Sequence, residues 1–446
     1  MRALYRHIAG LLLQAVLLAG FAACTNDSPH EGERGLVVAL DNSQCRDVAI
    51  GQVGLFVYDV GGNLCATYDY ADAHGVALAL LPLEAGHYTV ATVINGVADP
   101  AATISLTSLH EWVEREANLN GDLLSGKADA EVGADGVTRV TLPLQRQAFS
   151  LPICELKLKL SGVDLSDFTP LQPGSRAAEA GYTIRCVVEF CRAGTEQVVL
   201  HKAITPFLRE DGTYGLELQM SEGTYDMRLW MDFARKEAPL ADTYYHTENL
   251  KAISIITKPY LACTDAKDAA CGNSSGILVT EEGATVRMEL QRPLAKYRII
   301  ADADELKAYL NMRDANPGVF PTIDELTVSV QYEGFFPSAY NVLTGKPNDA
   351  VGGIAYTHSL SHYDGSATEL ELAADWIFVN GNASFVTATV IVSDSKGNVI
   401  CRVPGVQIDY RRNELTTIRG RFLTSGANSG GVCIDTTWDG CYDVWF

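Results

Sequence analysis

The stretch with the strongest catalytic appearance is GDLLSGKA, residues 121–128, which has the G-x-x-x-x-G-K skeleton of a phosphate-binding loop. Such a loop needs a hydroxyl for Mg²⁺ after the lysine, a preceding apolar strand and a following helix. Here Ala128 follows the lysine, the preceding EREANLN is polar, and the following DAEVGADG is rich in turn residues. The sequence therefore predicts a plain surface loop.

Residues for other kinds of catalysis are present but scattered. The chain has no G-x-S-x-G nucleophile motif, no ordered Asp-x-Asn loop for Ca²⁺ and no paired C-x-x-C for zinc. Carboxylate pairs for glycoside hydrolysis depend on spatial separation, which a sequence does not give. We therefore expect no enzyme, no metal site and no cofactor. The histidines are scattered along the chain and are expected to be exposed to solvent: His74, His87, His110, His201, His246, His358 and His362.

Eleven cysteines are present, and Cys24 belongs to the N-terminal segment treated below. The remaining ten suit an exported chain with disulfides, although the sequence does not fix their connectivity. Three pairs close short loops or flank an expected hairpin: Cys45 with Cys65, Cys263 with Cys271, and Cys433 with Cys441.

Aromatic residues offer the remaining chemistry, which is stacking on sugar rings. Trp230 falls on the polar face of an alternating strand, and Tyr244 and Tyr245 follow it in a loop. These three side chains either form a ligand-stacking surface or pack beneath a crossing loop. The terminal CYDVWF, residues 441–446, is apolar enough to dock as a final edge strand of its own domain or to be lent to a partner.

The elements that would position these residues are strands. Apolar and polar residues alternate with period two, which is typical of antiparallel strands with one packed face. Gly, Asn, Asp and Pro clusters separate the strands, as in β-sandwiches. The fold class is predicted to be all-β, with tandem antiparallel β-sandwiches and only short helices. Examples are LKLKL (156–160), YDMRLWMDF (225–233) and LTVSVQY (326–332).

Two short helices are expected among these strands. DADELKAYLNMRD, residues 302–314, begins with a capping aspartate, Asp302. SLHEWVEREANL, residues 108–119, surrounds Trp112. Neither helix is long enough to cover a sheet.

One phrase occurs twice and suggests internal repetition. VTLPLQRQAF, residues 140–149, is echoed by VRMELQRPLAK, residues 286–296. In each case a new strand follows Leu-Gln-Arg, so the phrase is interpreted as a domain junction, the alternative being chance similarity of amphipathic strands. The predicted domains are 35–147, 148–291 and 292–446, the last with a C-terminal tail.

The N-terminus has the features of an export signal. Arg2 and Arg6 precede an apolar run, which ends at Ala22-Ala23-Cys24. Residues 1–23 are predicted to be a lipoprotein signal peptide, Cys24 the lipidated residue, and 24–34 a polar tether. Phe21 departs from the usual lipobox, and an ordinary secretory cut is the alternative.

The charge balance restricts the partners. The formal net charge is −21, with 55 acidic and 34 basic residues. Nucleic acid requires a basic surface, and anionic lipid repels an acidic one, so neither is expected to bind electrostatically.

At these residues the chain resembles the fimbrillin-like lipoproteins of Bacteroidota, which include minor fimbrial anchor subunits and a related outer-membrane lipoprotein domain of unknown function. The likeness is carried by VGLFVYDVGGNL, LEAGHYTVATVINGVAD, RLWMDFARKEAPLADTYYHTENLKAI, LQRPLAKYRIIADADEL, FPSAYNVLTGKPNDAVGGIAY and YRRNELTTIRGRFLT. The resemblance implies sandwiches of transthyretin-like or Greek-key type, a lipid anchor in the outer membrane with the chain exposed on the cell surface, and assembly by strand donation. Three units and many cysteines depart from the usual anchor pattern.

The expected function is therefore that of a cell-surface lipoprotein acting in adhesion, or as an anchor or accessory subunit of a fimbria-like assembly. Its partners would be the membrane, through the N-terminal lipid, and a pilin or another surface protein, through strand pairing. The alternative is a surface glycan-binding lipoprotein that uses Trp230, Tyr244 and Tyr245.

Overall fold

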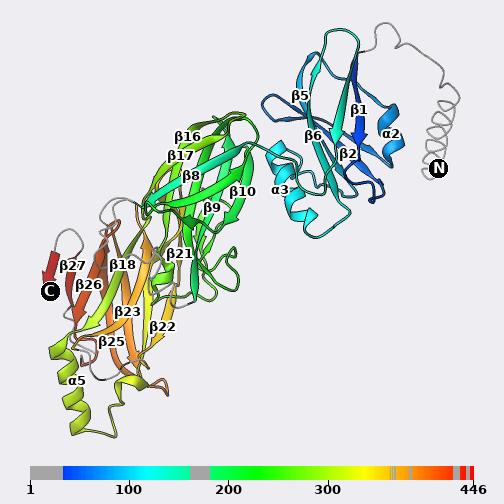
Figure 1. Ribbon diagram of the computed structural model, residues 1–446. Helices are drawn as coiled ribbons and strands as arrows, with labels where there is room; N and C mark the ends of the chain where they lie inside the picture. Colours follow the sequence, from blue (N-terminus) through cyan, green and yellow to red (C-terminus); the bar gives the residue numbers. More distant parts are fainter. Residues whose placement is uncertain are drawn as a thin grey trace, which may run out of the picture. The chain divides into compact units, whose positions relative to one another are not determined.

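The computed structural model describes most of the chain (Figure 1). The described residues are 34–160, 181–361, 363, 365, 368–380, 384–424, 432–437 and 442–445. The predicted signal peptide, the lipidation residue Cys24 and almost all of the predicted tether lie outside them. The all-β fold class is confirmed, because strands dominate and helices are short.

Two compact units make up the described chain. The first takes the described residues up to Leu151 together with Ser221–Gly223, and the second takes the rest. The first unit contains β1 (Gly35–Asp41), β2 (Val53–Asp59), β3 (Leu64–Tyr70), α2 (Ala73–Leu78), β4 (Leu80–Leu81), β5 (Gly86–Ile94), α3 (Leu106–Ala117), β6 (Leu124–Val132) and β7 (Val137–Pro143).

The first unit is a sandwich of the sheets β4-β1-β7 and β3-β2-β5-β6. Strand β2 is buried on both faces, which explains its nearly continuous apolar sequence. Leu55 packs in the core between the sheets, whereas the neighbouring Phe56 packs in a second cluster with Trp112 and Val113 of α3. The helix predicted around Trp112 is thus confirmed, and it packs against one face of this sheet.

The second unit contains two further sandwiches and a small additional sheet. The first part has β8 (Ile153–Leu160), β9 (Tyr182–Arg192), β10 (Val198–Ile204), β11 (Phe207–Leu208), β12 (Tyr214–Gln219), β13 (Gly223–Arg235), β14 (Tyr245–His246), β15 (Ile253–Ile255), η1 (Asp265–Lys267), β16 (Ala270–Val279) and β17 (Ala284–Leu290). The second part has β18 (Leu294–Ala301), α5 (Ala303–Ala315), η2 (Ile323–Glu325), β19 (Thr327–Glu333), β20 (Phe335–Asn341), β21 (Lys346–Gly352), β22 (Ala355–Ser359), β23 (Leu370–Phe378), β24 (Ser384–Ser393), β25 (Val399–Tyr410), β26 (Leu415–Gly420), β27 (Val432–Thr437) and β28 (Tyr442–Trp445).

The same seven-strand order occurs three times along the chain, and we call each occurrence a repeat. One sheet of each repeat has the order β3-β2-β5-β6, β10-β9-β13-β16 or β22-β19-β24-β25. The other sheet contains β4-β1-β7, β12-β8-β17 or β23-β18-β26. In all three, the first strand pairs in parallel with the last, as β1 with β7, β8 with β17 and β18 with β26. The sequence predicted antiparallel sheets and gave no sign of this parallel pair.

The echoed Leu-Gln-Arg phrase has a structural role at the end of the first two repeats. Gln145 exchanges two main-chain hydrogen bonds of 2.9 Å with Ser125 on β6. Gln291 makes the equivalent bridge with Cys271 on β16, at 2.8 and 2.9 Å. In both repeats the last strand therefore pairs with one sheet and then bridges to the other, which closes one side of the sandwich.

The predicted boundary near Gln291 lies inside the second unit. The small sheet β14-β15-β20-β21 joins strands from both sides of that boundary, and one hydrophobic core runs through the unit. The predicted division into three domains stays a prediction.

The second predicted helix is confirmed as α5. Asp302 caps it, and its carboxylate accepts hydrogen bonds from the main-chain N–H groups of Asp304 and Glu305 at 3.1 and 2.9 Å. Among the described residues, no helix combines the length and the apolar character needed to cross a membrane.

Candidate functional site

The phosphate-loop skeleton of residues 121–128 does not form a loop throughout. Residues from Leu124 onward belong to β6, where Lys127 pairs with Ala91 of β5. Gly126 is required by close packing, because a Cβ there would lie 2.6 Å from the carbonyl oxygen of Pro143. The prediction of a surface loop was wrong for the second half of the motif, and an extended strand cannot cradle a phosphate.

The predicted stacking residues Trp230, Tyr244 and Tyr245 are buried, with exposed fractions of 0%, 5% and 1%. Trp230 and Tyr245 pack edge to face, with ring centroids 5.2 Å apart at 75°. The indole N–H of Trp230 donates to Asp232 at 3.0 Å. These rings leave no exposed face for a sugar, so the stacking surface is not formed and the packing alternative describes their environment.

A buried charge network holds the segment between β13 and β14. Arg185, which is 1% exposed, donates to both carboxylate oxygens of Asp232 at 2.9 and 2.7 Å. It also donates to the Asp242 carboxylate at 2.9 Å and to the Leu240 carbonyl at 3.1 Å. Both acceptors lie in the segment between β13 and β14. The charged face of β13 is therefore an interior face, covered by this segment.

Two of the predicted disulfides are not formed. Cys45 is a buried thiol that donates to the carbonyl of Leu144 at 3.6 Å, whereas Cys65 is exposed on the edge strand β3. Cys263 and Cys271 are also free thiols. Their neighbourhoods explain why they do not pair.

The main-chain N–H of Cys263 donates to Ala374 of β23, whereas Cys271 bridges to Gln291. Burial raises the pKa of both thiols to about 12, so they stay protonated at neutral pH. The third predicted pair, Cys433 with Cys441, lies outside the residues whose side chains are described.

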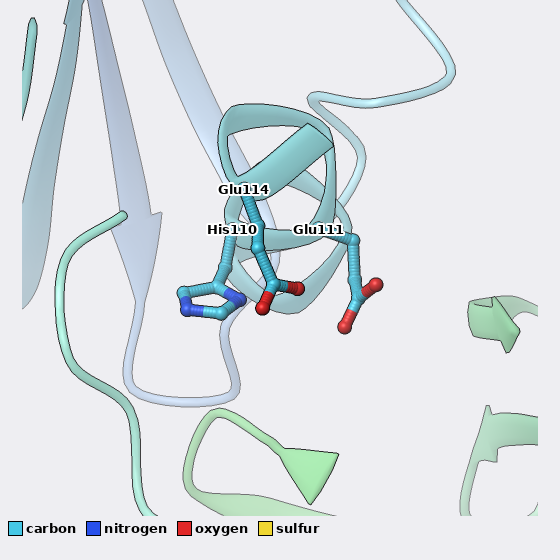
Figure 2. A group of neighbouring side chains, drawn as sticks. All are labelled: His110, Glu111 and Glu114. Carbon is cyan, nitrogen blue, oxygen red and sulfur yellow. The ribbon is translucent and has the colours of Figure 1, made fainter. Parts of the chain in front are cut away.

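A histidine and two glutamates on α3 come close to one another (Figure 2). His110, Glu111 and Glu114 each offer one potential ligand atom, and these atoms lie within 4.8 Å of one another. The expectation of an exposed histidine is wrong for His110, which is buried and whose ring packs edge to face on Phe149 with centroids 5.6 Å apart. Packing in the first unit therefore accounts for the histidine. Sequence analysis missed this grouping because it depends on the phase of the helix.

A groove with exposed aromatic rings lies in the second unit. We call this the aromatic groove, a cavity of about 410 Å³ whose rim includes Phe335 of β20 and Phe385 of β24. These rings are 79% and 61% exposed, which is unusual for phenylalanine. The lining also includes polar residues, namely Asp349, Asn380 and Ser384. The alternation of ASFVTATVI does place Phe385 opposite the buried Val386, but nothing in the sequence pairs it with Phe335.

The last repeat differs from the other two at one sheet edge. Strands β7 and β17 end their sheets, at the edge beside β1 and β8 respectively. The equivalent strand β26 is followed in its sheet by β27 and β28. Strand β27 pairs antiparallel with β26 over six positions, from Leu415 opposite Thr437 to Gly420 opposite Val432. The C-terminal segment thus docks on its own repeat, the first of the two arrangements expected from sequence.

Comparison with known proteins places the chain in a family. The model of a family of unknown function, DUF6562, matches residues 156–444. The chain belongs to the DUF6562 family. The match covers most of the second unit, including the aromatic groove and the edge at β26. No curated protein matches the chain.

Several solved structures are similar at low identity. A proposed polysaccharide-binding protein of Bacteroides thetaiotaomicron is 8% identical, with a TM-score of 0.38, over 64% of this chain and 95% of its own. The tip fimbrial protein Mfa3 of Porphyromonas gingivalis is 9% identical, with a TM-score of 0.31, over 64% and 99%. The fimbrial anchor protein Mfa2 of the same organism is 11% identical, with a TM-score of 0.31, over 60% and 90%. These values are too low to assign a function to this chain.

Proposed function

We propose that this DUF6562 chain is a cell-surface protein that acts in adhesion, or as an anchor or accessory subunit of a fimbria-like assembly. The observation that carries the proposal is the added strand β27 at the edge of β26. Equivalent edges in the other two repeats carry no such addition in the described chain. Because β27 is added beside the last strand of its repeat, a strand from another subunit could take its place.

The mechanism is strand pairing. An open edge presents a row of main-chain N–H and C=O groups that a partner strand can satisfy, and alternate side chains of that strand enter the sandwich or face water. In one direction β27 leaves and a partner strand pairs with β26. In the other direction the segment containing β27 is lent to the edge of a partner. Both directions require β27 to leave β26.

Truncation tests whether the terminal segment controls association. Cells would express the full chain or a chain ending at residue 430, and partners would be cross-linked at the surface, purified and quantified. Loss of the strand should either abolish or increase recovery of a defined surface subunit, according to the direction of exchange. A chain ending at residue 437 keeps β27 and is the matched control. Equal recovery from all three chains would contradict the proposal.

The proposed anchor is a lipid on Cys24, supported by the small residues before that cysteine. Metabolic labelling with palmitate, with and without globomycin, tests it in wild type and in Cys24→Ala. The wild-type protein should be labelled and retained in the outer membrane, and the variant should be neither. An unlabelled wild-type protein would remove the anchor but leave strand pairing untouched.

A second candidate function is glycan binding, now at the aromatic groove rather than at Trp230. Exposed rings stack on the apolar faces of sugars, and carboxylate and amide groups nearby bind hydroxyls. The double variant Phe335→Ala, Phe385→Ala should lose binding on a glycan array. Phe207→Ala removes a 45% exposed ring on β11 and is the control. Absence of any saccharide binding by the wild type would exclude this function.

A further inference from the structure

A lysine and an aspartate meet in the interior of the second unit. Nζ of Lys267, in η1, lies 2.6 Å from Oδ1 of Asp375, on β23. Their side chains are 3% and 0% exposed. The amine and the carboxylate are therefore shielded from water, and they are held together as a hydrogen-bonded ion pair. Such placement replaces a bimolecular encounter with an intramolecular one.

Two tyrosine hydroxyls contact the same carboxylate. Tyr260 donates to Oδ2 of Asp375 at 2.6 Å, and Tyr332 donates to the same oxygen at 2.8 Å. Burial raises the pKa of both hydroxyls well above the ordinary value, and the charge of Asp375 raises it further, so both remain protonated donors. The other oxygen, Oδ1, accepts the main-chain N–H of Trp376 at 2.8 Å.

Tyr260 also contacts the amine. Nζ of Lys267 donates to the Tyr260 hydroxyl at 3.0 Å and lies 4.2 Å from the centre of its ring. One hydroxyl thus bridges the nitrogen of Lys267 and the Oδ2 atom of Asp375. This arrangement forms a proton path from the amine to the oxygen that is not bonded to it.

We propose that Lys267 and Asp375 condense to form an intramolecular amide bond. The ammonium first passes one proton to the carboxylate, which gives an amine and a carboxylic acid. The lone pair on Nζ then attacks Cγ, the bond from Cγ to Oδ2 breaks, and Oδ2 leaves as water. The second proton of that water comes from Nζ through the Tyr260 hydroxyl.

The atoms and charges of the reaction balance without another reactant. The ammonium and carboxylate contain three N–H bonds and two oxygens, and the products are a neutral amide with one N–H and one water. No oxidant or reductant is needed. Oδ1 becomes the amide oxygen, and the N–H of Trp376 stabilises the negative charge that develops on it during the attack.

Other buried ion pairs of this unit lack one or more of these features. Arg185 and Arg292 pair with Asp232 and Asp268, but a guanidinium is always charged and is not a nucleophile. Lys296 lies 2.7 Å from Asp265, whose side chain is 21% exposed. Water competes at that carboxylate, so this second lysine pair is the internal comparison for the reaction.

The bond would change how the unit responds to force and unfolding. It would join η1 to β23 and close residues 267–375 into a covalent ring. That ring contains β20 and β21, two of the four strands of the small sheet, and the beginning of the last repeat. A surface protein under tension would then keep this part of its chain from extending. This property is independent of strand pairing at β26.

Mass spectrometry of the folded protein tests the proposal. The wild-type chain should weigh less than its sequence by the mass of one water. Its tryptic digest should contain a branched peptide joining Lys267 to Asp375, with no cleavage after Lys267. The branched peptide is read directly from the wild type, so this result does not depend on whether a variant folds.

Variants then separate the roles of the residues. Lys267→Arg should restore the full mass, and Tyr260→Phe should raise the uncondensed fraction in protein that remains folded by circular dichroism. Lys296→Arg, the matched control, should keep the deficit of one water. The proposal would be overturned if the folded wild-type protein had its full mass and trypsin cleaved it after Lys267. Lys267 and Asp375 would then form only a non-covalent ion pair.

Discussion

Replacing Arg185 by methionine probes the interaction that buries the charged face of β13. Arg185 and Asp232 are both 1% exposed and share two hydrogen bonds of 2.9 and 2.7 Å. Methionine keeps much of the side-chain volume but leaves the Asp232 carboxylate without its counter-charge. Removing one partner of a buried ion pair costs about 3–5 kcal/mol, so the free energy of unfolding of the second unit should fall by about that amount.

The double variant Arg185→Met, Asp232→Leu distinguishes the charge from the packing. It removes the uncompensated carboxylate but leaves the indole N–H of Trp230 without its acceptor. An unsatisfied buried donor costs about 1–3 kcal/mol, so the double variant should be more stable than the single one. Urea unfolding, followed by fluorescence and circular dichroism, measures both. Leaving a buried carboxylate unpaired is costly, so a single variant whose free energy of unfolding lies within about 1 kcal/mol of wild type would refute this account of the interior. A double variant less stable than the single variant would refute it as well.

Three other predictions concern stability. Trp230→Ala should cost about 3–5 kcal/mol in urea unfolding, as expected for a fully buried indole, and should leave any glycan binding unchanged in a properly folded fraction. Burial raises the pKa of Glu189, but hydrogen bonds from His201 and Arg228 outweigh it and the net pKa is lowered. Glu189→Gln should therefore lower the free energy of unfolding at neutral pH. This loss relative to wild type should shrink as the pH falls below the ordinary carboxyl range, because a lowered pKa stabilises only the ionised form. A loss that grows in acid would contradict the prediction. Asp302→Ala should cost about 0.5–2 kcal/mol by removing the cap of α5, with Asp302→Asn as the control that keeps it; no change in the melting of the helical signal would contradict the cap.

The sequence predicted what local pattern determines. Period-two alternation identified the strands, and the cap at Asp302 identified α5. The echoed phrase marked equivalent positions, since Gln145 and Gln291 make the same bridge in consecutive repeats. These features depend on residues that are close together in the sequence, so they can be predicted from it.

The features that sequence analysis missed depend on contacts between distant segments. Trp230 lies on a polar face of β13. Arg185, some 45 residues earlier, binds both this face and the segment between β13 and β14, which covers it. The pairing of Lys267 with Asp375 and the meeting of Phe335 with Phe385 in one groove are of the same kind. Sequence proximity suggested disulfides, but the four cysteines of the two described pairs are free thiols, since neighbours in sequence are not thereby neighbours in the fold.

The central claim is that β27 must leave β26 for the protein to associate with a surface partner. Thr417 lies opposite Asp435 in this pairing, so Thr417→Cys with Asp435→Cys allows a reversible cross-link between the two strands. Recovery of the partner subunit should be low when the cross-link is oxidised and should return on reduction, with each single cysteine variant unaffected. Equal recovery in the oxidised and reduced states would contradict the claim.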